Sequence, residues 1–167
     1  LEQQDVADHL TTTDLVYSAS ANGYAGAGLQ VETGGGIFKG IFYAGVPGGS
    51  LGSSVTFGIF QRSDGTLRRI AAGLRVGVGT GLSQTITAAF TLGGSAFRAE
   101  AYHESSTLTA TATGTTPASG AAAVTGTPSA NKITIFSSSG CVGKFYGGVL
   151  INRALTAGEK TDVRAWI

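Results

Sequence analysis

Between residues 36 and 136 the chain alternates short apolar stretches with turn-forming residues, and no segment has the period of an amphipathic helix. Apolar stretches that recur every 8–12 residues or so are typical of a β-sandwich or jelly roll. Glycine supplies 27 of the 167 residues, and glycine and β-branched residues both disfavour helices. The pattern therefore predicts an all-β fold, a two-sheet antiparallel sandwich.

Two stretches have the pattern of β-hairpins. Residues 55–62 alternate between two faces, and Ser63-Asp64-Gly65-Thr66 follows them with the Asp-Gly pair typical of a type I′ turn. A strand over residues 97–103 is expected to pair with one over residues 108–113. Residues 114–129 are mostly small, and we expect them to form a connection between strands.

The end of the chain predicts a strand that leads into a tight corner. Because side chains alternate along a strand, Phe145, Val149 and Ile151 are expected on one face. Tyr146 and Leu150 are then expected on the other face.

A short closing helix is expected after that corner. Thr156 and Glu159 have the spacing of a capping box, in which each side chain binds the backbone N–H of the other residue. Val163 and Trp166 fall on one side of the helix, so we expect it to pack on the sandwich with Trp166 as a core anchor.

This strand, the Asn152-Arg-Ala-Leu-Thr156 corner and the final helix together resemble the C-terminal signature of laminin-G-like, concanavalin A-like lectin domains. The order of the expected strands in the middle of the chain is similar as well, so the resemblance covers residues 17–167. It implies a jelly-roll sandwich with a short C-terminal helix that commonly binds sugars. Such domains are frequent in bacteriophage virion proteins and bacterial surface proteins, so the resemblance implies a place in a virion or at the cell surface.

One domain is expected over residues 15–167, after a lead-in or connector over residues 1–14. The chain has no methionine, which is typical of a processed or excised part of a longer protein. Its net charge of +1 argues against nucleic acid as a partner, and no apolar run approaches the ~20 residues that membrane insertion requires. The expected partners are a surface polysaccharide or other glycan and other virion or surface-protein chains. A homo-oligomer is compatible with the sequence.

Carboxylate pairs are the first candidates for catalysis, because the same sandwich carries some glycoside hydrolases. Glu100 and Glu104 lie on one strand face, but four residues along a strand span ~13 Å. Retaining hydrolysis requires carboxyl groups about 5–5.5 Å apart. No serine or cysteine nucleophile has a suitable neighbouring base. We therefore expect no catalytic residue and a domain that is not an enzyme, with a glycan hydrolase as the least favoured alternative.

No metal or other cofactor is expected. His9 and His103 have no neighbours at ligand spacing. Asp64 and Glu104 are the only acidic residues in plausible mid-chain turns, too few for a calcium shell of six or more oxygens. Cys141 is the only cysteine, so it forms no disulfide within the chain. We expect it to be a small buried side chain, with a bond to a partner chain as the alternative.

The best candidate for carbohydrate binding is the polar stripe formed by Glu100, Tyr102 and Glu104, with the turn at Asp64 nearby. Carboxylates accept hydrogen bonds from sugar hydroxyls, and an aromatic ring can stack on a sugar. Alternatively, the stripe faces water or a neighbouring subunit. Tyr24 and Tyr146 are further candidates for exposed rings, with packing inside the domain as the alternative.

The sequence thus favours a carbohydrate-binding or adhesion domain of a phage tail or head fibre or spike, or of a bacterial surface protein. It would recognise host surface polysaccharide. The alternative is a purely structural virion decoration or spike module that makes protein–protein contacts.

Overall fold

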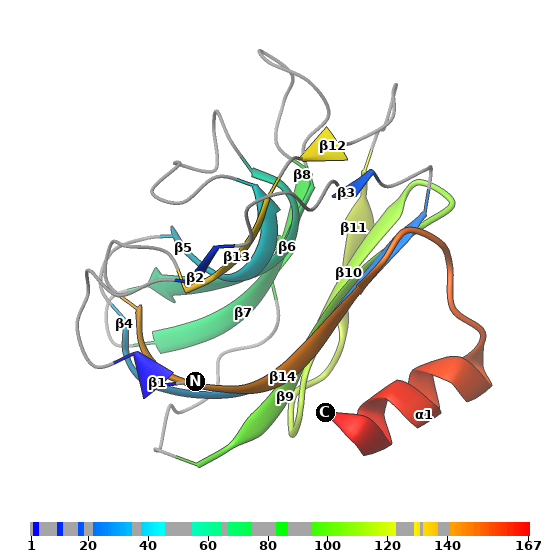
Figure 1. Ribbon diagram of the computed structural model, residues 1–167. Coiled ribbons are helices and arrows are strands. Elements are labelled where there is room, and N and C mark those ends of the chain that lie inside the picture. Colours follow the sequence, from blue (N-terminus) through cyan, green and yellow to red (C-terminus); the bar gives the residue numbers. More distant parts are fainter. Residues whose placement is uncertain are drawn as a thin grey trace.

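A computed structural model describes residues 2–3, 10–11, 17–18, 22–34, 38–45, 55–64, 67–74, 83–86, 95–122, 129–130, 132–136 and 141–167. Within them, two six-stranded sheets face each other, and a helix lies outside one of them (Figure 1). Among these residues no helix is both long and apolar enough to cross a membrane.

The strands of each sheet run antiparallel to their neighbours. The helix-side sheet has the order β1 (Glu2–Gln3), β14 (Cys141–Ile151), β4 (Gly23–Gly34), β9 (Phe97–Glu104), β10 (Thr107–Ala112) and β11 (Ala118–Ala121). The opposite sheet has the order β2 (Leu10–Thr11), β13 (Ile133–Ile135), β5 (Phe38–Gly45), β6 (Val55–Asp64), β7 (Leu67–Leu74) and β8 (Ser83–Ile86). A small third sheet pairs β3 (Tyr17–Ser18) with β12 (Ser129–Ala130). The predicted all-β, two-sheet antiparallel sandwich is therefore confirmed.

The hydrophobic core fills the space between the two large sheets. The helix-side sheet contributes mainly alanines from β4, β9 and β10, whereas larger side chains come from β5, β6 and β7. Phe42 of β5 and Phe145 of β14 meet across the sandwich with their ring centroids 5.3 Å apart. None of the core residues comes from the helix.

Both predicted strand pairs form hairpins, while the predicted Asp64-Gly65 turn is not confirmed, because Asp64 lies in the strand. In the first, Asp64 of β6 lies opposite Leu67 of β7, and residues 65 and 66 between them lie outside the described residues. In the second, β9 and β10 are joined by Ser105 and Ser106, whose φ angles of 46° and 67° are left-handed. Two left-handed residues are what a type I′ turn requires. The Ser105 N–H also donates to Oδ1 of Asn22 at 3.1 Å, which ties this turn to the start of β4.

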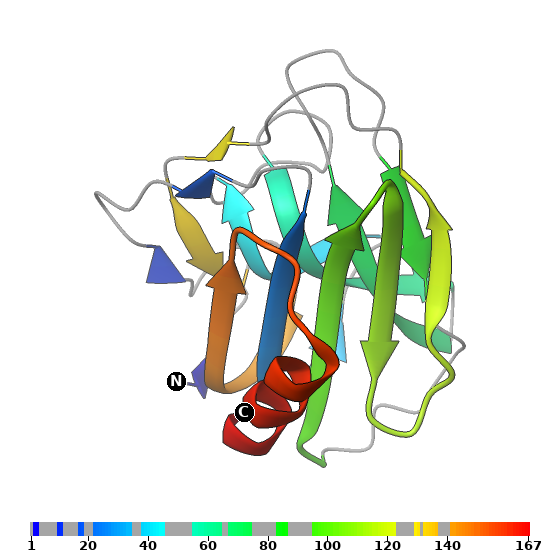
Figure 2. The same ribbon diagram turned by 90° about the vertical axis from the view of Figure 1, so that its right-hand side faces the viewer.

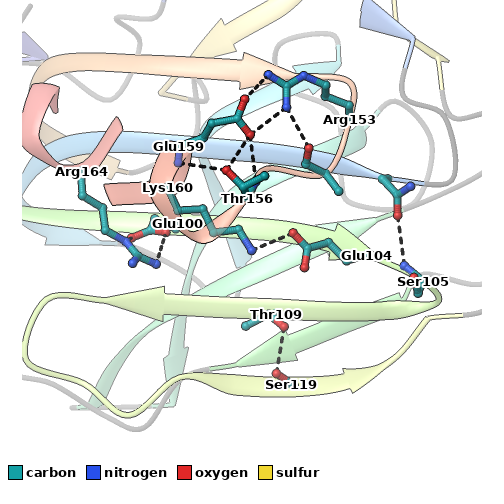
Figure 3. Close-up of polar contacts among 12 residues, drawn as sticks. Glu100, Glu104, Ser105, Thr109, Ser119, Arg153, Thr156, Glu159, Lys160 and Arg164 are labelled. Atoms are coloured by element: carbon teal, nitrogen blue, oxygen red, sulfur yellow. Dashed lines mark hydrogen bonds and ion pairs between the residues drawn. The ribbon is translucent and has the colours of Figure 1, made fainter. Parts of the chain in front are cut away.

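The prediction of a plain connection over residues 114–129 is wrong in part, because β11 lies within it. The strand consists of alanine, serine and glycine and pairs with β10 at the sheet edge. Its pairing needs only backbone groups, so its small side chains give little sign of it. Thr109 and Ser119 join β10 to β11 through their hydroxyl oxygens, 2.8 Å apart (Figure 3).

The predicted faces of β14 are wrong beyond Tyr146. The register with β4 shifts between Phe145 and Gly147, so Tyr146 is an extra residue in the strand. Such a β-bulge reverses the alternation of side chains after it. Leu150 therefore packs against the core on the same side as Phe145, instead of on the opposite face.

The predicted closing helix is confirmed as α1 (Ala157–Trp166), and its capping box is present in full. The Thr156 hydroxyl accepts from the Glu159 N–H at 3.2 Å, and the Glu159 carboxylate accepts from the Thr156 N–H at 2.8 Å. The predicted role of Trp166 is wrong, because its side chain is 66% exposed. No residue of α1 is buried, and Val163 is only half-buried. Charged side chains make the contact instead, because Lys160 and Arg164 pair with Glu104 and Glu100 of β9.

The predicted lead-in contributes to both large sheets. Glu2 and Gln3 of β1 pair with β14, and Leu10 and Thr11 of β2 pair with β13. The boundary between residues 14 and 15 stays a prediction.

Two truncations should separate the core from the outer surface. Phe145→Ala removes a ring buried against Phe42, so we expect it to cost about 3–5 kcal/mol of unfolding free energy. Trp166→Ala removes an exposed side chain, so we expect a loss below about 1 kcal/mol. Urea unfolding followed by far-UV circular dichroism measures both. Equal losses would show that Trp166 is a core residue after all.

Candidate functional site

Helix α1 lies across the outer face of the helix-side sheet, in front of β14, β4 and β9 (Figure 2). Its strongest contact is the ion pair between Arg164 and Glu100 on β9 (Figure 3). Arg164 Nε donates to Glu100 Oε1 at 2.7 Å, and Arg164 NH2 donates to Oε2 at 2.9 Å. Glu100 is only 5% exposed, and its hydrogen bond raises the pKa of Arg164. Arg164 is thus charged at neutral pH and binds Glu100 at two points.

A second basic side chain of the helix, Lys160, makes two contacts with β9. Its Nζ lies 2.7 Å from Oε1 of Glu104 (Figure 3), and 4.0 Å from the centroid of the Tyr102 ring. A cation over a ring face at this distance is attracted by the ring quadrupole. Tyr102 in turn stacks on Tyr24, with the ring planes 17° apart and the centroids 6.3 Å apart.

Tyr24, which stacks on Tyr102, is completely buried. Burial, and then the neighbouring Glu100 carboxylate, raise the pKa of the Tyr24 hydroxyl well above its ordinary range. The hydroxyl is therefore neutral at physiological pH. Tyr24 thus packs inside the protein, which was the alternative to an exposed ring.

The structure brings three of the four predicted carbohydrate-binding residues together. Glu100, Tyr102 and Glu104 follow one another along the outer face of β9, as the alternation predicts, and all three contact α1. Asp64 ends β6 in the opposite sheet, and its side chain lies outside the described residues. Carbohydrate contact by these residues stays a prediction.

A groove lies beside the C-terminal end of α1. Its volume is about 390 Å³, and it is lined by Gly28, Leu29, Ala96, Phe97, Arg98, Thr113, Tyr146 and Ile167. Arg98 NH1 donates to the backbone carbonyl of Arg164, while the Arg98 N–H donates to the Thr113 hydroxyl at 3.1 Å. The sheet and the residues next to it therefore form most of the groove, and Ile167, directly after α1, also lines it.

Two large aromatic side chains are exposed on this face. Among the described residues, Tyr146 at 58% and Trp166 at 66% are the large hydrophobic side chains that are exposed. The Tyr146 hydroxyl donates to Oε1 of Gln30 at 2.7 Å, which fixes the direction of its ring. The Trp166 ring stands over the next residue of β14, because a Cβ on Gly147 would lie 3.7 Å from it. Both rings thus belong to the same side of the molecule, beside the groove.

Sequence reasoning identified Tyr146 but missed Trp166. The helical pattern placed Trp166 with Val163 on an apolar side. A contrary signal was present, because Lys160 and Arg164 are four residues apart on the helix and Glu100 and Glu104 share one strand face. Helix positions i and i+4 lie on the same side of a helix. Lys160 and Arg164 can therefore each reach one of the two carboxylates.

The described residues hold no group of three or more His, Cys, Asp or Glu side chains arranged to bind a metal ion. His103 is buried in β9. His9 and the side chain of Cys141 lie outside the described residues, so the expectations for them stay predictions.

The fold is that of the concanavalin A-like jelly-roll sandwiches. One solved structure that shares it is a heptameric SAP-like pentraxin from Limulus polyphemus, at 9% identity and a TM-score of 0.63, over 90% of this chain and 72% of that one. Another is an alginate lyase from Pseudomonas aeruginosa, at 13% identity and a TM-score of 0.51, over 77% of this chain. The match spans 64% of the length of the lyase.

A mutant Trypanosoma rangeli sialidase that displays trans-sialidase activity also shares the fold. The TM-score is 0.56 at 13% identity, over 83% of this chain and 22% of that one. No protein-family model and no curated protein matches the chain, so the laminin-G-like assignment stays a prediction.

These similarities contradict the prediction that the domain is not an enzyme. That prediction depended on spacing between carboxylates and on a resemblance to lectins. The alginate lyase and the sialidase are enzymes by name, and their structures share this fold. A jelly roll of this kind therefore gives no ground for excluding catalysis.

The pH dependence of the α1 cap follows from Glu159. Hydrogen bonds from Arg153 first, and from the Thr156 backbone next, lower the pKa of the Glu159 carboxyl from 4.5 to about 2. Because the folded pKa is the lower one, the cap stabilises α1 fully above pH 4.5, and this contribution is lost as the pH falls towards 2. We expect a carbon-detected NMR titration to give a Glu159 midpoint near 2.

The matched variant is Arg153→Gln, which removes the main cause of the shift. We expect it to raise the pKa of Glu159 towards 4.5 while the capping bonds to Thr156 remain. A midpoint near 4.5 in the unaltered protein would contradict the observed pairing of Arg153 with Glu159.

Proposed function

We propose that this domain recognises glycans through the groove between β9, β14 and the end of α1. The observation that carries the proposal is the presence of Tyr146 and Trp166, two exposed rings, beside a groove that also contains a guanidinium group and a hydroxyl. Exposed apolar patches rimmed by polar groups commonly mark interaction sites.

The chemistry of the groove suits a sugar. The apolar faces of aromatic rings stack on the C–H faces of sugar rings, while nearby polar groups bind hydroxyls. Arg98 supplies donors, and Thr113 supplies a donor and an acceptor. The occurrence of the same fold in an alginate lyase and a sialidase supports a glycan as the ligand.

The setting that we propose is an adhesion domain at an exposed surface, in a laminin-G-like lectin of a phage fibre or spike or of a bacterial surface protein. An open groove with two rings makes few contacts with each sugar chain, so each site would bind weakly. Several copies on one particle would convert weak single-site binding into firm attachment to surface polysaccharide through effective concentration.

A structural module is the second candidate. Tyrosine and tryptophan are enriched at protein–protein interfaces as well, so Tyr146 and Trp166 would also fit contact with another chain of a virion or surface assembly. Under that alternative the same substitutions disturb assembly and leave glycan binding unaffected.

Glycan binding can be tested with the multimerised domain on an array that includes alginate, sialylated glycans and bacterial surface polysaccharides. We expect Tyr146→Ala and Trp166→Ala each to weaken binding about tenfold or more, because aromatic anchors commonly contribute more than 1 kcal/mol. Thr107→Ala is the control, since Thr107 is exposed at the far end of β10. Binding that is absent, or that survives both ring substitutions, would overturn the proposal.

The same glycans should be assayed for cleavage. Release of unsaturated or reducing ends from a glycan that the domain binds would assign the groove to an enzyme. Tyr102→Ala in the binding assay tests the predicted stripe: unchanged binding would exclude contact between Tyr102 and the glycan, because Tyr102 does not line the groove.

A further inference from the structure

We infer that the charged contacts beneath α1 position the glycan site, with Glu100–Arg164 and Glu104–Lys160 as positioning residues. This inference rests on the proposed function, because it concerns the same groove. The pairs do not line the groove. They act through the helix, whose last turn carries Trp166 and leads directly into Ile167, which lines the groove.

The helix has few other means of holding its place. No residue of α1 is buried and none belongs to the core cluster, so apolar packing fixes its orientation only weakly. By contrast, Glu100 is almost completely buried and binds Arg164 at two points. A buried carboxylate without its partner is strongly unfavourable, so the docked position of the helix is specified at Arg164.

Arg164 is two residues before Trp166, so the fixed position of Arg164 also fixes the position of Trp166. The backbone of the same turn is held as well, because Arg98 donates to the Arg164 carbonyl. Lys160, one turn earlier, is held between Glu104 and the Tyr102 ring. Contacts on two successive turns set both the height and the direction of the helix above the sheet.

Strand β4 has a glycine where the end of α1 comes closest to it. Gly28 of β4 lies directly under the end of α1, where a Cβ would collide with the backbone carbonyl of Ile167. The absence of a side chain at Gly28 therefore allows the last turn to come close to the sheet. Ile167 and Gly28 then both line the groove.

The chain carries its own probe of this geometry, because Trp166 is its only tryptophan. The emission spectrum and acrylamide quenching of Trp166 report the position of the last turn. Far-UV circular dichroism reports the sandwich separately. These readouts distinguish a displaced helix from an unfolded domain.

Gly28→Ala is the first test, because it changes neither a ring nor a charge. We expect the added methyl group to displace the last turn, alter the emission of Trp166 and weaken glycan binding about tenfold. The matched control is Gly158→Ala, where the new Cβ would lie 3.9 Å from the Thr156 hydroxyl oxygen, an ordinary contact. We expect Gly158→Ala to preserve the emission and the binding.

The charged contacts are tested by a swap. Lys160→Glu should alter the emission of Trp166 and weaken binding about tenfold, because it places like charges together. Adding Glu104→Lys should restore both towards the starting values. Glu100→Gln, which keeps the shape of the side chain and removes its charge, should also weaken binding and make the emission of Trp166 less sensitive to salt.

The outcomes separate this inference from the proposed function. If Tyr146→Ala and Trp166→Ala weaken binding while Gly28→Ala, Lys160→Glu and Glu100→Gln do not, the groove binds glycans and the positioning inference is wrong. If the swap fails to restore either readout although circular dichroism shows a folded sandwich, the inference is also wrong. If binding survives both Tyr146→Ala and Trp166→Ala, the proposed function fails, and the inference fails with it.

Discussion

The buried carboxylate of Glu100 is the constraint on which the outer face of the helix-side sheet depends. Charged residues are only 13% of this chain, and a carboxyl side chain that is 5% exposed is costly to bury without a partner. Arg164 supplies that partner from a helix at the far end of the sequence. Tyr24 and Tyr102, next to Glu100, are buried and half-buried, and Ile167, directly after the helix, lines the groove. One ion pair therefore links the sandwich to its candidate site.

The sandwich itself depends on a different principle, the pairing of small with large residues. Alanines of β4, β9 and β10 face phenylalanines and isoleucines of the opposite sheet, so the two layers interdigitate closely. This division leaves the core complete without α1. Substitutions in α1, or in the residues of β9 that contact it, can therefore alter the candidate site without disturbing the core.

Local interactions made much of this structure predictable. The β6–β7 pair, the β9–β10 pair and the Thr156–Glu159 capping box each depend on residues close together in sequence. The errors arise where distant contacts decide. The bulge at Tyr146 depends on how β14 pairs with β4. The edge strand β11 depends on backbone pairing with β10. Trp166 points outward because the sheet below α1 is acidic and aromatic, which no pattern within the helix can reveal.

The stripe on β9 shows how the same residues support opposite interpretations. Carboxylates and a tyrosine on one strand face have the composition of a sugar-binding patch, yet they equally suit a seat for a basic helix, since both partners require acceptors and a ring. What separates the two is whether the chain itself supplies the cations, and it does, because Lys160 contacts Glu104 and Arg164 contacts Glu100. Function follows from sites and not from folds. In this domain the exposed rings are Tyr146 at the bulge and Trp166 at the end of the helix, while the polar stripe contacts the helix through Lys160 and Arg164.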